Sequence, residues 1–203
     1  MDSAIRQERL TRHDVYTQYR GCSCWAYLND VRNNRHFLWT MAGLGREQGN
    51  TLLDVGCYNG WLDFCIMAAL PMIKCTGVEV SPLLCKSSHE YAAANGIKWN
   101  VYTGFFDELV IPGHYDVCSM YEVLEHMPME TAIACTDKAA QLASRVMISL
   151  PNQDYHDNPD HLWTPTEELI RDTWGSKPHF EMERWKYPGT TIPDNWACTW
   201  RAE

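Results

Sequence analysis

The chain has 203 residues, of which 45% are hydrophobic and 21% charged, a balance typical of a globular domain with a sizeable core. Its net charge of −9 argues against a large nucleic-acid-binding surface, although several arginines make the N-terminal part more positive. No apolar run approaches the roughly 18 residues of a membrane span, and Met1 to Leu10 lacks the apolar core of a signal peptide. We therefore expect a cytoplasmic protein without a membrane segment.

Nine cysteines are present, but their number is odd and no pair has Cys-x-x-Cys spacing. Five of them have apolar neighbours, where a free thiol behaves as a small hydrophobic side chain. These are Cys57, Cys65, Cys75, Cys85 and Cys118. We expect reduced core cysteines rather than disulfides or a zinc site.

Residues 1–48 have the pattern of helices, with loops expected near Gly21 and Gly43. The segment is rich in aromatic residues and admits two interpretations. It forms either a helical layer over one face of a sheet or a lid whose aromatic side chains close over a substrate. We treat it as a helical cover and residues 50–203 as the α/β core of one domain.

From Leu52 onward, short apolar runs alternate with helical stretches, which predicts a parallel α/β sheet. After a first strand that leads into Asp54, strands are expected at Lys74–Val80, Trp99–Thr103, Tyr115–Met120, Arg145–Leu150, His179–Trp185 and Trp196–Trp200. Helices are expected at Trp61–Leu70, Ser81–Asn95, Met129–Ala143 and Thr164–Trp174. Ser81 is expected to be the N-cap of the second of these helices, and Thr164 or Thr166 the N-cap of the last. The last two strands, joined by a Pro/Gly-rich loop, resemble a hairpin.

The first strand, a turn framed by Gly56 and Gly60, and the following helix form a strand–turn–helix unit. Glycine lets the backbone bend and approach a ligand closely, and the helix directs unpaired N–H groups at the turn. The letters D-V-G-C-Y-N-G-W-L resemble the first motif of class I S-adenosylmethionine-dependent methyltransferases, in which glycine usually stands at the position of Tyr58. The resemblance implies that Gly56, Cys57, Tyr58 and Gly60 hold the methionine part of the cofactor and that Asp54 supports the turn.

An acidic residue, Glu79, closes the second predicted strand 19 residues after Gly60. At this place a carboxylate can accept hydrogen bonds from both ribose hydroxyls of a nucleotide, with Val80 beside it. A nicotinamide enzyme would share this feature, but its fingerprint needs a second glycine where Tyr58 stands. The pattern therefore favours S-adenosylmethionine over NAD.

Two further segments resemble the methyltransferase families. Gly104-Phe105-Phe106-Asp107 corresponds to the adenine-binding region, which implies packing by Phe106 and a hydrogen bond from the adenine amino group to Asp107. The strand that starts at Tyr115 ends in E-V-L-E-H, which places Tyr121 and Glu122 at the carboxyl edge of the sheet beside the reacting atoms. Downstream, Leu150-Pro151-Asn152 and the segment from His161 to Leu169 also match the family.

The resemblance implies a Rossmann-like seven-stranded sheet, parallel except for an antiparallel C-terminal strand, with helices on both faces. It implies a methyltransferase that uses S-adenosylmethionine on an oxygen or nitrogen atom of a small-molecule acceptor. A general base is needed only if the acceptor must lose a proton, and His126, Glu122 and His161 are the candidates. We expect no metal and no nucleic-acid partner, and the oligomeric state stays open.

Two alternatives remain. Glu122, Glu125, His126 and His161 reproduce the E-x-x-E-H…H set of Hen1-type RNA 3′-terminal 2′-O-methyltransferases, in which this set holds a divalent metal. The other alternative is a non-catalytic subunit that binds S-adenosylmethionine or a partner protein. The presence of Gly56, Gly60 and Glu79 argues against a degenerate pocket.

Overall fold

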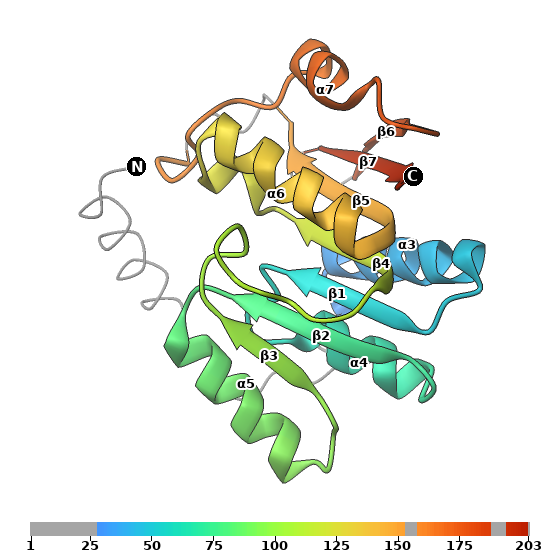
Figure 1. Cartoon of the computed structure of the whole chain (residues 1–203), viewed down its shortest axis with the longest axis vertical. Helices are drawn as coiled ribbons and strands as arrows, with labels where there is room; N and C mark the ends of the chain where they lie inside the picture. Colours follow the sequence, from blue (N-terminus) through green and yellow to red (C-terminus); the bar gives the residue numbers. More distant parts are fainter. Residues whose placement is uncertain (1–27, 153–157, 188–193, 203) are drawn as a thin grey trace.

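The computed structural model describes residues 28–152, 158–187 and 194–202. The helical prediction for residues 1–27 and the loop expected near Gly21 lie outside these residues. Seven strands form one sheet in the order β3-β2-β1-β4-β5-β7-β6 (Figure 1). All neighbouring pairs are parallel except β5 with β7 and β6 with β7. The predicted fold class, with its antiparallel C-terminal strand, is confirmed.

The strand bounds follow the sequence pattern closely. They are β1 Thr51–Val55, β2 Lys74–Glu79, β3 Asn100–Thr103, β4 Tyr115–Tyr121, β5 Ala143–Pro151, β6 Glu181–Trp185 and β7 Asn195–Arg201. The chain runs outward from β1 to β3 and then returns to β4 on the other side of β1. This reversal is the topological switch point, where open α/β sheets bind ligands at the carboxyl ends of their strands.

Helices cover both faces because successive strand residues point to opposite sides. Leu53 and Val55 of β1 belong to a core that includes residues of α6 (Met129–Leu142) and α7 (Glu167–Trp174). Leu52 belongs to the opposite core, with residues of α3 (Val31–Glu47), α4 (Trp61–Ala69) and α5 (Pro82–Ala94). Figure 1 shows α6 lying over β4 and β5, with which it is in contact.

One face of α3 contacts the sheet through residues that are spaced three or four positions apart, as residues on the same face of a helix are. His36 Nε2 lies 2.9 Å from Ser149 Oγ, and Thr40 Oγ1 lies 2.7 Å from the Tyr121 hydroxyl. A Cβ on Gly43 would lie 2.4 Å from the Met147 sulfur. At the end of the helix, the largely buried side chain of Glu47 accepts hydrogen bonds from Arg145 and Arg201. Helix α3 is therefore fixed in register on β4 and β5.

The loop expected near Gly43 is wrong, because α3 continues through this residue to Glu47. The glycine is needed for a close approach to Met147 rather than for a turn. Asp30 caps the start of the helix by accepting from the backbone N–H groups of Arg32 and Asn33. Helix α3 thus lies over one face of the sheet, and both the helical cover and the lid over a substrate stay predictions for the N-terminal segment.

The local predictions for two other helix starts are confirmed. Ser81 accepts a hydrogen bond from the N–H of Leu84, and Thr166, rather than Thr164, accepts from the N–H of Leu169. All seven cysteines within the described residues are buried, as predicted for the five named above. No helix in the described part of the chain is long and apolar enough to cross a bilayer.

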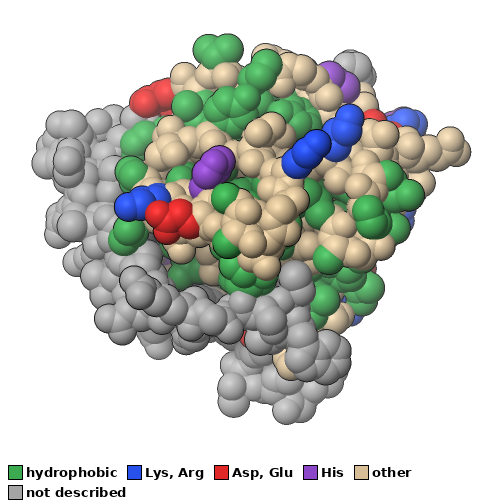
Figure 2. Space-filling view, turned by 90° about the horizontal axis from the view of Figure 1, so that it is seen from below, with side chains coloured by type: hydrophobic (Ala, Val, Ile, Leu, Met, Phe, Trp, Pro, Cys, Tyr) green, Lys and Arg blue, Asp and Glu red, His purple; other side chains and the backbone are tan. Residues whose placement is uncertain are grey.

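Charged side chains are dispersed on the face of the molecule drawn in Figure 2. Lys and Arg side chains of the described residues appear there in small separate groups, between hydrophobic and uncharged surface. On the face that is drawn, this distribution is unlike the continuous basic stripe that tracks a phosphate backbone.

Candidate active site

The turn after β1 is built around left-handed backbone conformations. Gly56 and Gly60 both have a φ of +76°, and Tyr58 between them has a φ of +54°. A side chain in this region costs about 1–2 kcal/mol, so Tyr58 is strained at the position where the motif that it resembles usually has glycine. The N–H groups of Gly56 and Cys57 both donate to the carbonyl oxygen of Val78. The turn is therefore anchored to the end of β2.

Glu79 joins this turn to the next helix. One carboxylate oxygen accepts from the N–H of Tyr58 at 3.0 Å, and the other accepts from the N–H of Ser81 at 2.9 Å. A carboxylate has about four acceptor positions, so a single side chain can hold the backbone and accept from a ribose hydroxyl at the same time. The half-exposed Val80 lies between Glu79 and Ser81. The glycine turn and the acid thus lie side by side, as the proposed cofactor cradle requires.

Asp54 is buried at the end of β1 and supports the site through the neighbouring strand. Its Oδ1 accepts a 2.6 Å hydrogen bond from Ser119 Oγ on β4. Burial raises the pKa of Asp54 to about 7, against the opposing effect of the Ser119 hydrogen bond. Asp54 therefore ties β1 to β4 just below the turn.

The segment predicted to bind adenine is held by α6. Phe106 is buried in the core, and Lys138 lies over its ring at 5.0 Å from the centroid. The Lys138 ammonium also donates to the carbonyl oxygens of Phe106, Asp107 and Leu109. Asp107 has an exposed side chain, whereas Phe105 is half-buried. Adenine contacts of Phe106 and Asp107 stay predictions, and the exposed side chain of Asp107 is the more accessible of the two.

The glycine turn and the E-V-L-E-H segment are in direct contact. A Cβ added to Gly56 would lie 2.3 Å from Val123 Cγ2. Val123 follows Glu122, whose backbone is left-handed with a φ of +56° and whose N–H donates to the carbonyl oxygen of Ser149. The turn and the predicted catalytic segment therefore share one end of the sheet, at the switch point between β1 and β4.

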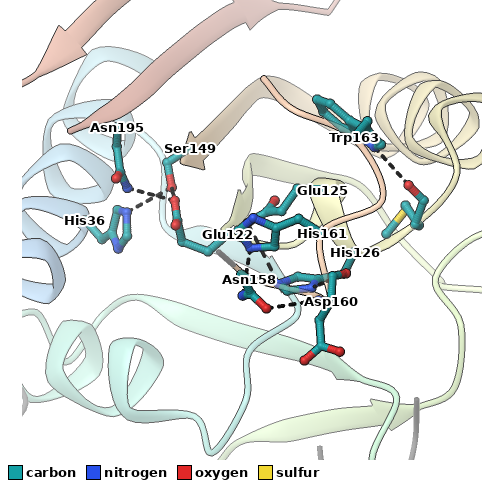
Figure 3. A network of polar contacts seen from close by, with 11 residues as sticks. His36, Glu122, Glu125, His126, Ser149, Asn158, Asp160, His161, Trp163 and Asn195 are labelled. Atoms are coloured by element: carbon teal, nitrogen blue, oxygen red, sulfur yellow. Dashed lines mark hydrogen bonds and ion pairs between the residues drawn. The ribbon is translucent and has the colours of Figure 1, made fainter. Parts of the chain in front are cut away.

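Glu122 belongs to a polar network whose members are far apart in the sequence. Its Oε1 accepts from Ser149 Oγ at 3.0 Å and from Asn195 Nδ2 at 2.7 Å, and Ser149 Oγ contacts His36 (Figure 3). Burial raises the pKa of Glu122 to about 7, against the opposing effects of the Ser149 hydrogen bond and the Arg32 charge. Tyr121, predicted to bind the cofactor, stacks on the His36 ring with a 4.5 Å centroid distance.

Glu125, His126 and His161 form a second group (Figure 3). Their potential ligand atoms all lie within 4.8 Å of one another, and Glu125 Oε1 is 3.9 Å from His126 Nε2 and 4.0 Å from His161 Nε2. Glu125 is fully buried, neither of its oxygens has a hydrogen-bond partner within the described residues, and burial raises its pKa well above the usual value. Such a carboxyl is either protonated or compensated by a cation.

The second group is itself supported by the loop before α7. His126 Nδ1 lies 3.3 Å from the carbonyl oxygen of Asp160, and Asn158 Nδ2 lies 3.0 Å from His161 Nε2. The structure thus brings the predicted residues His126 and His161 together. It places the Glu122 carboxylate in the separate network with Ser149 and Asn195.

The profile of the methyltransferase-domain family matches residues 25–188, most of the chain. The chain belongs to this family. A curated relative, the ubiquinone biosynthesis O-methyltransferase of Bordetella parapertussis, is 30% identical over 92 residues. These residues are 44% of this chain and 37% of the relative, so the match spans well under half of the relative's length.

Solved structures with the same fold include two methyltransferases. The small RNA methyltransferase HEN1 superposes with a TM-score of 0.65 at 22% identity, covering 84% of this chain and 25% of that chain. The magnesium protoporphyrin IX methyltransferase of Synechocystis PCC 6803 superposes with a TM-score of 0.65 at 20% identity, and the match covers 98% of this chain and 90% of that chain. The latter was crystallised with S-adenosylmethionine, the cofactor of class I methyltransferases. At the level of the family, the expected cofactor is confirmed.

Proposed function

We propose that this methyltransferase transfers the methyl group of S-adenosylmethionine to an oxygen or nitrogen atom of a small-molecule acceptor. The observation that carries the proposal is the packing of Gly56 against Val123, which joins the cofactor turn to the segment that bears Glu122 and His126. The O-methyltransferase relative favours oxygen as the acceptor atom. Buried cysteine thiols suit the reducing cytoplasm, which we keep as the proposed location.

The protein itself has to supply little of the chemistry of methyl transfer. S-adenosylmethionine supplies an electrophilic methyl group, and the chain aligns the acceptor and excludes water. A hydroxyl acceptor must also lose its proton, which requires a base near neutrality. Glu122, with a pKa of about 7, meets that requirement, while His126 and His161 remain the alternative bases.

The first test is calorimetry with S-adenosylmethionine and with its demethylated product. We expect both to bind with micromolar or tighter dissociation constants. Transfer from tritiated S-adenosylmethionine would then be measured against catechol, a primary amine and a carboxylic acid, with catechol expected to be methylated. Failure of both cofactor forms to bind would contradict the proposal, whereas binding without transfer to any class would favour the non-catalytic alternative.

A second candidate function is metal-dependent methylation of an RNA 3′-terminal ribose. It is favoured by the buried Glu125 carboxylate, whose oxygens lack partners within the described residues and face His126 and His161. One carboxylate and two imidazoles suit Mn²⁺ or a similar transition ion better than Mg²⁺. When bound, the ion would offer a Lewis-acid site for neighbouring hydroxyls. The net charge of −9 and the position of Glu122 outside the group speak for the first candidate.

The two candidates differ in their response to Mn²⁺. If the second holds, His161→Ala lowers the affinity for Mn²⁺ by at least about tenfold in calorimetry, because one of three ligands is lost. His114→Ala serves as the matched control, since His114 is exposed and bonds only to Ser144 among the described residues. Equal Mn²⁺ binding by wild type and His161→Ala, with no methylation of a short RNA that has a free 3′-terminal ribose, would eliminate this candidate.

A further inference from the structure

We propose that Trp99 and Asp63 are positioning residues for the cofactor: the Trp99 ring sets the spacing between the glycine turn and the strand that ends in Glu79, and Asp63 holds that ring in place. The inference rests on the proposed methyltransferase function and deepens it, because the turn and Glu79 are the two predicted parts of the cofactor site. Trp99 lies just before β3 and Asp63 lies in the first turn of α4, and neither belongs to a segment that resembles the family.

The outer part of the Trp99 ring occupies the space beside two glycines. A Cβ on Gly60 would lie 2.9 Å from Trp99 Cη2, and a Cβ on Gly77 would lie 2.7 Å from Trp99 Cζ2. Both distances are well below the 3.5–4.0 Å or so of an ordinary contact between carbon atoms. Gly60 caps the start of α4, and Gly77 lies on β2 two residues before Glu79. The ring therefore touches the backbone of both elements and determines how closely they approach each other.

The turn itself reaches the same glycine through Cys57. A Cβ on Gly77 would lie 2.6 Å from Cys57 Sγ, and the buried side chains of Cys57 and Trp99 belong to one hydrophobic core. The N–H groups of Gly56 and Cys57 donate to the carbonyl oxygen of Val78, the residue after Gly77. A displacement of the ring is therefore passed on to the residues that anchor the turn to β2.

Asp63 holds the other end of the indole. Trp99 Nε1 donates to Asp63 Oδ2 at 2.7 Å, and both side chains are buried. Asp63 lies three residues after Gly60, so the indole contacts the first turn of α4 at two points. Phe64 meets the ring nearly edge-on, at 5.0 Å between centroids. The ring cannot turn away from the glycines without breaking a buried hydrogen bond.

The role of Asp63 in this contact needs an acceptor but not a charge. Burial raises the pKa of Asp63 well above its usual value, with a further rise caused by Asp54 and an opposing effect of the Trp99 hydrogen bond. Its other oxygen, Oδ1, has no hydrogen-bond partner within the described residues. A neutral carboxyl still accepts through its carbonyl oxygen, and so does an amide. Asp63→Asn is therefore expected to keep the anchor, and Asp63→Leu to remove it.

Trp174 provides a matched control for Trp99. It is also a buried tryptophan whose Nε1 donates to a buried side chain, Thr136 Oγ1, at 3.0 Å. Trp174 lies on α7, in the core on the opposite face of the sheet. Trp174→Phe and Trp99→Phe remove the same atoms and one buried hydrogen bond each. Both are expected to lower the free energy of unfolding, but only Trp99→Phe is expected to loosen the glycine turn.

The first measurement examines the turn without cofactor. Hydrogen exchange is followed by NMR at the N–H groups of Tyr58 and Gly60, which donate to Glu79 Oε2 and to the carbonyl oxygen of Cys57. We expect Trp99→Phe to exchange at both positions about tenfold faster than Trp174→Phe, because local opening of the turn becomes easier. Equal exchange in the two variants would show that the ring does not hold the turn and would overturn the inference.

The second measurement is calorimetry with the demethylated cofactor on folded samples. Trp99→Phe and Asp63→Leu are expected to weaken binding by about tenfold, the equivalent of one lost hydrogen bond. Asp63→Asn and Trp174→Phe are expected to bind like the wild type, although Trp174→Phe is destabilised. A role in stability alone would lower the affinity of none of these variants while they remain folded.

Equal affinity in the wild type, Trp99→Phe and Asp63→Leu would contradict the inference, as would equal losses in Trp99→Phe and Trp174→Phe. If Trp99→Phe does not fold, the comparison of Asp63→Leu with Asp63→Asn decides in both measurements. The wild type tests the proposed function separately. A wild type that fails to bind the cofactor contradicts that function, whereas the exchange rates still decide whether Trp99 holds the turn.

Discussion

Glu79→Ala is expected to weaken the binding of S-adenosylmethionine by about 100-fold, because hydrogen bonds to a charged group are worth about 1.5–3 kcal/mol each. The substitution removes the predicted acceptor for two ribose hydroxyls. It also leaves the N–H groups of Tyr58 and Ser81 without the carboxylate that now orients them. The dissociation constant is measured by calorimetry with the demethylated product as well as with the cofactor.

The control for this substitution is Glu90→Ala. Glu90 lies on α5 with an exposed side chain and a 3.9 Å ion pair to Lys86, the kind of surface contact that contributes little. Its removal is expected to leave cofactor affinity unchanged. Glu79→Asp, which keeps the charge but shortens the reach, should lie between the wild type and Glu79→Ala. Equal cofactor affinity in the wild type and Glu79→Ala would refute the ribose assignment.

Gly56→Arg is expected to abolish measurable cofactor binding. Two effects combine at this position: a backbone φ of +76°, which costs a side chain about 1–2 kcal/mol, and a Cβ position 2.3 Å from Val123 Cγ2. The collision is with the residue that follows Glu122, so it would push the turn away from the segment that is predicted to be catalytic. Calorimetry with S-adenosylmethionine and urea unfolding separate lost binding from lost stability.

Gly96→Arg provides a matched comparison for the backbone effect alone. Gly96 has a φ of +65°, but a Cβ there would have no atom within 4 Å. We expect Gly96→Arg to lose about 1–2 kcal/mol of unfolding free energy and to bind the cofactor normally. If Gly56→Arg binds as tightly as Gly96→Arg, the assignment of the glycine turn to the cofactor is wrong.

The sequence predicted the parts of the structure that depend on local signals. The cap at Ser81 and the alternation of apolar runs with helical stretches can be read from a few adjacent residues. The predicted strands and helices agree with the structure to within about three residues at each end. Gly43 misled the prediction because its role is tertiary: it makes room for Met147, which lies on β5, more than a hundred positions away.

For the same reason, the sequence predicts some residues of the candidate site but not the contacts between residues that are far apart in the chain. Gly56, Glu79 and Glu122 lie in recognisable patterns, whereas the contact between His36 and Ser149 spans 113 residues and that between Glu122 and Asn195 spans 73. One signal was present. Ser149 interrupts the apolar strand R-V-M-I-S-L, and a buried hydroxyl requires a partner. The sequence could indicate that a partner exists but not which residue it is.

The fit of α3 to the sheet restricts how this methyltransferase can admit and release molecules. Contacts at His36, Thr40, Gly43 and Glu47 recur along almost the whole helix, so a shift by even part of a turn would break polar bonds and drive the helix backbone into Met147. Sliding of α3 is therefore a poor route for opening. If molecules enter and leave at the carboxyl ends of the strands, we expect segments other than α3 to move, while α3 keeps its position on the sheet.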